Sequence, residues 1–207
     1  MLWIITGTII SYLIGSIPTA YIFGRLLKGI DIRQFGSGNV GATNAMRVLG
    51  KTPGITVLIL DALKGFMAVF FLGNFITMKC PVFSAEILSI LLGLACISGH
   101  NWTIFLRFKG GKGIATTLGV LIGLSIKIVA FKLILGLVIM TWLLVLVFFR
   151  FVSLSSIIAG ISLPVYLFVL KHSGILICLG IILAIFTILR HKQNIKRILQ
   201  GKEPRLF

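Results

Sequence analysis

Residues 133–149 read LILGLVIMTWLLVLVFF, an apolar run that contains no charged side chain and is bounded by Lys132 and Arg150. A helix that crosses a bilayer needs about 20 such residues. The whole 207-residue chain has the same character, since 58% of its residues are hydrophobic and its mean hydropathy is +1.13. Soluble domains carry a much smaller apolar share. The composition therefore predicts a membrane protein without a separate soluble domain.

The apolar runs predict an all-α polytopic membrane helix bundle with about seven transmembrane helices, forming one domain over residues 1–207. Lipid offers no hydrogen-bond partners to the backbone, and the strict alternation typical of barrel strands is absent, so the spans should be helical. The first run lacks a basic leader and a cleavage site, and we count it as a span. The candidate spans are 2–23, 54–76, 84–104, a short one at 114–126, 133–149, 153–170 and 174–189.

The net charge of +16 arises from 20 Lys and Arg against 4 Asp and Glu. In a soluble protein this excess would suggest nucleic acid, but in this chain the cations must lie in the loops, and no nucleic-acid partner is expected. Fifteen cations fall on one side of the predicted spans, whereas Lys79, Lys127, Lys132 and Lys171 fall on the other. The positive-inside rule then places the N-terminus outside and the C-terminus in the cytosol. All three polar segments described next fall on that cytosolic side.

The first polar segment, residues 35–47, reads FGSGNVGATNAMR. Glycines allow positive φ and close backbone approach, so successive N–H groups can face one anion, with Arg47 as a bidentate clamp. The segment therefore predicts a phosphate-binding loop, although a flexible connector is the alternative. Its candidate ligands are Ser37, Gly38, Asn39, Gly41, Thr43 and Asn44.

The second polar segment runs from His100 to Gly113 and reads HNWTIFLRFKGGKG. A glycine-rich turn that leads into a helix offers unpaired N–H groups and a positive dipole end to a phosphate. An ordinary basic loop would explain the cations but not the glycine spacing. The candidate ligands here are His100, Asn101, Lys109, Gly110, Gly111 and Lys112.

The third polar segment follows the last span and contains His191 and Asn194. These residues are three apart and would share one face of a continuing helix. A basic tail that grips anionic headgroups is the alternative for the surrounding lysines and arginines. It explains His191 and Asn194 less well, and a histidine among cations should stay neutral and able to accept a proton.

Acidic residues and cysteines are too few to build a metal centre. Asp61 and Lys64 are three apart within the second span, which favours a structural ion pair that faces the bundle interior. The four acids form no carboxylate cluster, and the three cysteines imply neither a disulfide nor a zinc framework. We therefore expect neither a metal nor a cofactor.

Taken together, these motifs resemble those of the bacterial acyl-phosphate-dependent glycerol-3-phosphate acyltransferases (the PlsY family) over nearly the whole chain. The resemblance rests on residues 15–18 (GSIP), 36–44 (GSGNVGATN) with Arg47, 61–65 (DALKG), 99–102 (GHNW), 108–113 (FKGGKG) and 191–194 (HKQN). Composition and spacing alone indicate only a membrane enzyme or carrier for a phosphorylated ligand.

The resemblance implies transfer of an acyl group from acyl phosphate to the sn-1 hydroxyl of glycerol 3-phosphate, the first step of phospholipid synthesis. It implies a multi-pass protein of the bacterial inner membrane, surrounded by lipid, with its active site facing the cytoplasm and a functional link to an enzyme that makes acyl phosphate. By similarity the first loop binds the acyl-phosphate phosphoryl group through Ser37 and Thr43. Glycerol 3-phosphate would be held by Arg47, Lys112, His191 and Asn194, and either His191 or a substrate phosphate takes the proton.

Two other function classes remain open from the residues. A membrane carrier for phosphate or an organophosphate also needs cationic loops, but carriers usually show internal repeats and polar groups on both sides. A scaffold that grips anionic lipid through the basic tail would leave both glycine loops unexplained. Flux without an acyl donor would favour the carrier.

Overall fold

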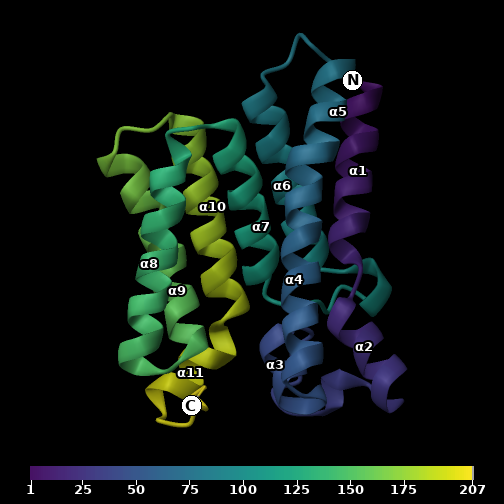
Figure 1. Cartoon of the computed structure of the whole chain (residues 1–207), viewed down its shortest axis with the longest axis vertical. Coiled ribbons are helices and arrows are strands. Elements are labelled where there is room, and N and C mark those ends of the chain that lie inside the picture. Colours follow the sequence, from purple (N-terminus) through teal and green to yellow (C-terminus); the bar gives the residue numbers. More distant parts are fainter. Residues whose placement is uncertain (207) are drawn as a thin grey trace. The chain divides into compact units, whose positions relative to one another are not determined.

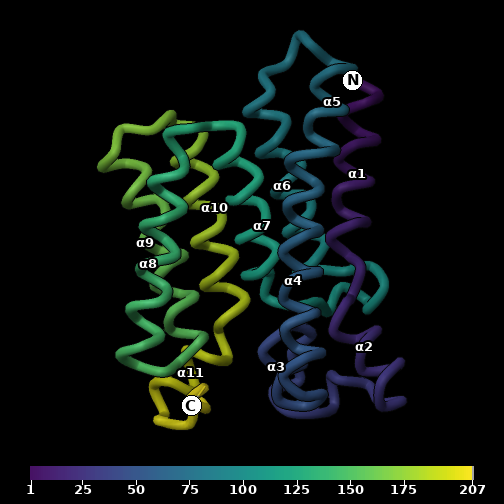
Figure 2. The backbone as a smooth tube through the Cα atoms, viewed as in Figure 1, coloured from purple at the N-terminus to yellow at the C-terminus, as the bar shows by residue number. Residues whose placement is uncertain are grey.

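Each long apolar run of the sequence forms a helix in the computed structural model, which describes residues 1–206 (Figures 1 and 2). No strand occurs among these residues. The all-helical prediction is therefore confirmed. Contacts divide the chain into two compact units, Met1–Lys127 and the chain from Ile128 onward. The expectation of one domain over residues 1–207 stays a prediction.

Among residues 1–206, five helical segments are long and apolar enough to cross a membrane, and a sixth is added if two helices joined by a 61° bend are taken as one span. The run at 114–126 forms a helix of only 14 residues, which is shorter than a bilayer requires. By length and composition the structure thus gives five or six candidate spans and one further, shorter apolar helix, so the expected number of about seven stays a prediction. The six are Leu2–Lys28, Lys51–Lys79, Ala85–Leu106, Phe131–Phe149, Val152–Val169 and the bent pair Gly174–Arg190 with Lys192–Leu199.

The first unit consists of a few long helices and several short segments that lead into and out of the polar loops. Two of the short segments, α2 and α3, lie at the end of the unit opposite the N-terminus (Figure 1). In chain order the segments are α1 (Leu2–Ser16), α2 (Thr19–Lys28), η1 (Ile32–Gln34), α3 (Ala42–Leu49), α4 (Lys51–Met67), η2 (Ala68–Leu72), α5 (Gly73–Lys79), α6 (Ala85–Asn101), η3 (Ile104–Leu106) and α7 (Ile114–Lys127).

Helix α1 packs along α6 at very short range. A Cβ atom at Gly15 would overlap the carbonyl of Cys96, and one at Gly99 would overlap the carbonyl of Tyr12. Small residues at such crossings let membrane helices approach closely, and the close approach increases the van der Waals contact that holds the helices together. The close crossing fixes the end of α6, and with it the start of the second polar segment.

The first span is broken between α1 and α2 at Ile17 and Pro18, where the tube in Figure 2 turns. Proline cannot donate a backbone hydrogen bond, so a continuous helix is interrupted there. The carbonyl of Ser16 instead accepts a hydrogen bond of 2.6 Å from the Thr103 hydroxyl, just beyond α6. The break is thereby tied to the segment that leads into the second glycine loop.

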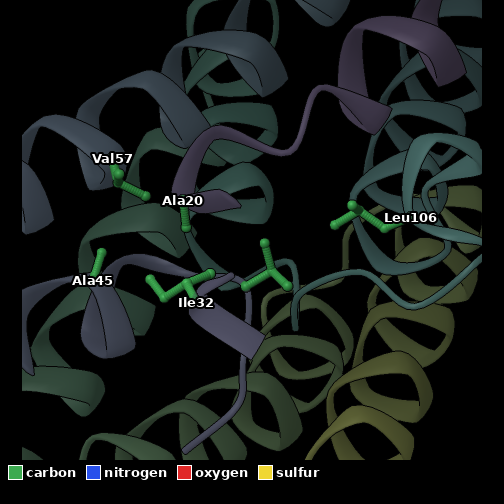
Figure 3. Packing of buried hydrophobic residues seen from close by; sticks show 6 residues of the cluster. Ala20, Ile32, Ala45, Val57 and Leu106 are labelled. Carbon is green, nitrogen blue, oxygen red and sulfur yellow. The ribbon is translucent and has the colours of Figure 1, made fainter. Parts of the chain in front are cut away.

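A small apolar cluster supports the first glycine loop (Figure 3). It joins α2, η1, α3, α4 and η3 through buried side chains, and Val40 carries the loop itself into this cluster with 4% exposure. Burial of these groups stabilises the unit, since each valine, leucine or isoleucine side chain fully removed from solvent contributes about 1.5–3 kcal/mol. The cluster consists of Ala20, Ile32, Val40, Ala45, Val57 and Leu106.

The second unit contains α8 (Phe131–Phe149), α9 (Val152–Val169), α10 (Gly174–Arg190) and α11 (Lys192–Leu199). Helix α9 packs against both α8 and α10. The chain after α11 folds back onto the α8–α9 connection, because the Leu206 N–H donates to the Arg150 carbonyl at 2.8 Å. This return places the C-terminal segment beside the start of α9.

Candidate functional site

The first glycine loop connects η1 to α3 and is shaped by one buried asparagine. Gly36 and Gly38 have φ of 61° and 70°, a region that favours glycine. The Asn44 side chain, 1% exposed, accepts from the Ser37 N–H at 2.8 Å and donates to the carbonyls of Ile32 and Phe35 at 3.3 and 3.1 Å. Asn44 thus holds the loop in shape, and its expected contact with substrate stays a prediction.

An acidic residue anchors the start of the same loop. Asp31 accepts hydrogen bonds from the Arg33 side chain at 2.6 and 2.9 Å and from the Arg33 N–H at 3.0 Å. The side-chain bond to Arg33 lowers the pKa of Asp31 to about 2, and the same bond raises the pKa of Arg33. The pair is fully ionised at neutral pH and fixes the backbone of Arg33. The Arg33 carbonyl oxygen would lie 3.0 Å from a Cβ atom at Gly38, so it adjoins the loop.

The second glycine loop is pinned to the end of α6. The N–H groups of Gly110 and Gly111 donate to the carbonyls of Asn101 and His100 at 3.2 and 3.0 Å. Gly113 has a φ of 78° and leads directly into α7. This arrangement presents the turn and the first residues of a helix together, the geometry that binds anions.

Unpaired polar atoms lie behind this second loop. The Asn101 side chain is 0% exposed and adjoins Gly113, and among residues 1–206 neither of its amide atoms has a hydrogen-bond partner. The hydroxyl of Thr116 in the first turn of α7 is likewise buried and unpaired in that part of the chain. A buried polar group without a partner costs about 1–3 kcal/mol, so these groups mark a place suited to a polar ligand.

The two glycine loops adjoin within the first unit. A Cβ atom at Gly111 would lie 2.8 Å from the carbonyl oxygen of Val40, in the first loop. Of the predicted ligands in these loops, Gly41, Asn44, His100, Asn101 and Gly111 are buried, whereas Arg47 and Lys109 are exposed. Partly exposed are Ser37, Gly38, Asn39, Thr43, Gly110 and Lys112.

His191 and Asn194 lie in the second unit, at a bend that the sequence did not predict. The helix does not continue through His191, because α10 and α11 meet there at 61°. The His191 ring, 2% exposed, has its Nδ1 2.8 Å from the Thr187 carbonyl. A carbonyl only accepts, so Nδ1 carries a proton, and in the neutral form of the ring Nε2 is then the nitrogen with the lone pair.

Sequence reasoning gave no role to Glu203, whose carboxylate connects three polar residues of the second unit. Its carboxylate accepts hydrogen bonds from Asn194, Ser153 and Arg197 at 2.6, 2.7 and 2.7 Å. Burial opposes ionisation of Glu203, but these three bonds outweigh that effect and lower its pKa. The sequence did contain a signal for this role, because acidic residues are scarce in the chain. A lone carboxylate in a strongly basic tail is expected to pair with specific neighbours.

Substituting Glu203 with glutamine should lower the melting temperature at neutral pH, because three bonds to a charged acceptor are weakened. The pKa of the folded state lies below the ordinary value of 4.5. The stabilisation is therefore present above pH 4.5 and is lost as pH falls through the folded pKa. Thermal unfolding of both proteins over that range measures the effect. The exposed neighbour Lys202→Gln should change little, and an equal shift in both variants would refute the role of Glu203.

The sequence from residue 5 to residue 201 matches the family model described as glycerol-3-phosphate acyltransferase. This chain belongs to the glycerol-3-phosphate acyltransferase family. It is 43% identical over 205 residues to glycerol-3-phosphate acyltransferase 2 of Moorella thermoacetica, covering 99% of this chain and 98% of that one. It is also 42% identical to the glycerol-3-phosphate acyltransferase of Staphylococcus haemolyticus, covering 98% of each chain.

Solved acyltransferase structures agree with this family assignment. The crystal structure of PlsY (YgiH), an integral membrane glycerol 3-phosphate acyltransferase, superposes in its glycerol 3-phosphate form with a TM-score of 0.85. The identity is 37%, and the match covers 99% of this chain and 96% of that one. A lysophosphatidic acid form of the same protein gives a TM-score of 0.82. This member of the acyltransferase family is accordingly an integral multi-pass membrane protein.

Proposed function

We propose that this chain transfers a fatty acyl group from acyl phosphate to the sn-1 hydroxyl of glycerol 3-phosphate. The products are 1-acylglycerol 3-phosphate, which is lysophosphatidic acid, and inorganic phosphate. One observation carries the proposal: a relative that matches over nearly the whole chain has been solved in both a glycerol 3-phosphate form and a lysophosphatidic acid form. These are one reactant and one product of such a transfer.

The reaction depends more on binding and orienting two phosphate groups than on a strong nucleophile. Acyl phosphate is a mixed anhydride with a good leaving group, so positioning and charge stabilisation supply most of what the protein must add. The glycerol hydroxyl oxygen forms the new bond to the acyl carbon, and the bond from that carbon to the phosphate oxygen breaks. The hydroxyl proton passes to His191 Nε2 or to a substrate phosphate.

The adjoining glycine loops of the first unit support the substrate assignment. We assign the phosphoryl group of acyl phosphate to the first loop, with Ser37 and Thr43 as donors. Arg47 and Lys112 supply positive charge for glycerol 3-phosphate, and His191 with Asn194 aligns its hydroxyl. The unpaired amide of Asn101 adds hydrogen-bonding capacity behind the second loop.

The choice of acyl donor is tested directly with purified protein and glycerol 3-phosphate. Acyl phosphate, acyl-CoA and acyl carrier protein thioester are supplied in turn, and lysophosphatidic acid and phosphate are measured. We expect product from acyl phosphate alone. Product from a thioester alone would overturn the donor assignment. Transport of glycerol 3-phosphate into proteoliposomes, with no transfer from any donor, would instead identify a carrier.

We further propose that the site faces the cytoplasm of a bacterial cell, at the inner membrane. The excess of cations on the side of both glycine loops supports this orientation. Single cysteines at exposed Lys51, Lys79 and Lys202 test it in intact cells with a membrane-impermeant maleimide. Only Lys79→Cys should react before lysis. Reaction of Lys51→Cys in intact cells would contradict the orientation.

A further inference from the structure

The second span of the first unit contains a charged pair that the proposed reaction does not use. Lys64 Nζ lies 2.9 Å from Asp61 Oδ1 within α4, and the two side chains are only 7% and 2% exposed. Ionisable groups at membrane depth are costly and occur where they serve a specific contact. An apolar pair of similar volume would often be as stable, so stability alone does not account for this pair.

The pair reaches the break in the first span. The Thr19 hydroxyl donates to the same Asp61 Oδ1 at 2.9 Å, and Lys64 Nζ donates to the Ile17 carbonyl at 3.1 Å. Ile17 and Thr19 flank the proline that interrupts the span. The charged pair therefore fixes both Ile17, which follows the end of α1, and Thr19, the first residue of α2.

The same carboxylate also faces the end of α6. His100 Nδ1 lies 3.8 Å from Asp61 Oδ1, an ion-pair distance that is longer than a hydrogen bond. The carboxylate therefore faces the Nδ1 side of the ring. On the opposite side of the ring, a Cβ atom at Gly111 would overlap His100 Nε2. The ring is thus packed between the buried acid and the second glycine loop.

Two further hydrogen bonds connect the position of His100 and of the break to the position of the second glycine loop. The Gly111 N–H donates to the His100 carbonyl at 3.0 Å, so backbone and ring of His100 both hold the loop. The Thr103 hydroxyl ties the far side of the same turn to the Ser16 carbonyl, beside the break. A shift of His100 or of the break would therefore move the loop at Gly110 and Gly111.

We propose that Asp61 is a positioning residue for this reaction: through His100 and the break at Ile17–Thr19, it fixes the second glycine loop in the place where the loop binds the phosphate of its substrate. The inference rests on the proposed function for the identity of that substrate. Asp61 is buried, with 2% of its side chain exposed, and acts through these contacts while paired with Lys64 inside the bundle.

The test uses the double substitution Asp61→Asn with Lys64→Met in the full-length purified protein. Changing Asp61 alone would leave a buried ammonium without its counter-ion, which destabilises a fold for reasons unrelated to the loop. Lys127→Met is the matched control. It removes a partly buried lysine contact in the same unit, 2.8 Å from Ser89 Oγ, at the opposite end of α7 from the loop.

Two readouts are measured, amide hydrogen exchange and steady-state kinetics. In the double variant, the amides of Gly110 and Gly111 should exchange about 10-fold faster or more, and KM for glycerol 3-phosphate should rise by about 10-fold or more with a smaller change in kcat. Lys127→Met should change neither quantity, even if its melting temperature falls.

Exchange and KM at wild-type values in a folded double variant would overturn the proposal, as would an equal rise in KM in Lys127→Met. Hydrogen exchange requires no turnover. A wild-type protein without acyltransferase activity would therefore refute the proposed function while the exchange data still decided whether Asp61 holds the loop.

Discussion

Replacing Gly111 with alanine is expected to lower kcat/KM for glycerol 3-phosphate by about 100-fold or more, since a misplacement of about 1 Å can have an effect of this size. The added Cβ would overlap His100 Nε2 and would lie 2.8 Å from the Val40 carbonyl oxygen. Neither neighbour can yield alone, because His100 is packed against the charged pair and Val40 is anchored in the apolar cluster. The loop itself must move, and both glycine loops are then displaced.

Steady-state kinetics with varied glycerol 3-phosphate and saturating acyl phosphate measure this loss. Gly136→Ala is the matched control, because a Cβ atom there meets nothing within 4 Å. An added methyl group in that helix should leave both activity and stability near wild type or slightly improve stability. Wild-type kcat/KM in a folded Gly111→Ala protein would show that the contact between the loops is irrelevant to the reaction.

Replacing His191 with glutamine is expected to lower kcat/KM by about 100-fold or more. Nδ1 faces the Thr187 carbonyl and carries a proton, so in the neutral form of the ring Nε2 is the nitrogen that can take up a proton. Glutamine places an amide near the position of Nε2, so it can form a hydrogen bond there but cannot take up a proton. A fall mainly in kcat would assign proton transfer to His191, whereas a rise mainly in KM would assign it to holding substrate.

His172 provides the control for this substitution. It is the other histidine of the second unit and lies in the α9–α10 connection, where its ring makes an edge contact with Phe131. His172→Gln should retain near-wild-type kinetics. If His191→Gln also retained wild-type kcat and KM, the role assigned to the third polar segment would have to be abandoned.

Periodicity and hydropathy predicted the helices because bilayer insertion depends on local composition. They also predicted a span at 114–126, where the structure has an apolar helix of only 14 residues. The bend at His191 was also missed. Just after the bend, Asn194 is held by Glu203 at 2.6 Å, a contact that the helical pattern of the sequence does not contain.

In the loops, too, some features could be predicted from the sequence and others could not. Gly36 and Gly38 were recognisable because positive φ favours glycine, and the structure places both in that region. The role of Asn44 was not recognisable, because a buried asparagine that shapes a loop and one that binds a ligand look identical in sequence. Likewise the spacing of Asp61 and Lys64 predicted the ion pair, but not that His100, far along the chain, would lie beside it.

Equilibrium binding of glycerol 3-phosphate, measured by calorimetry on the purified full-length protein without an acyl donor, is the most direct test of the phosphate site. We predict saturable binding by the wild-type protein and a dissociation constant raised by about 10-fold or more in Lys112→Met, because a bond between charged groups is lost. Gly136→Ala should bind as the wild type does. Unchanged affinity in a folded Lys112→Met protein would contradict the assignment of the second glycine loop to this substrate.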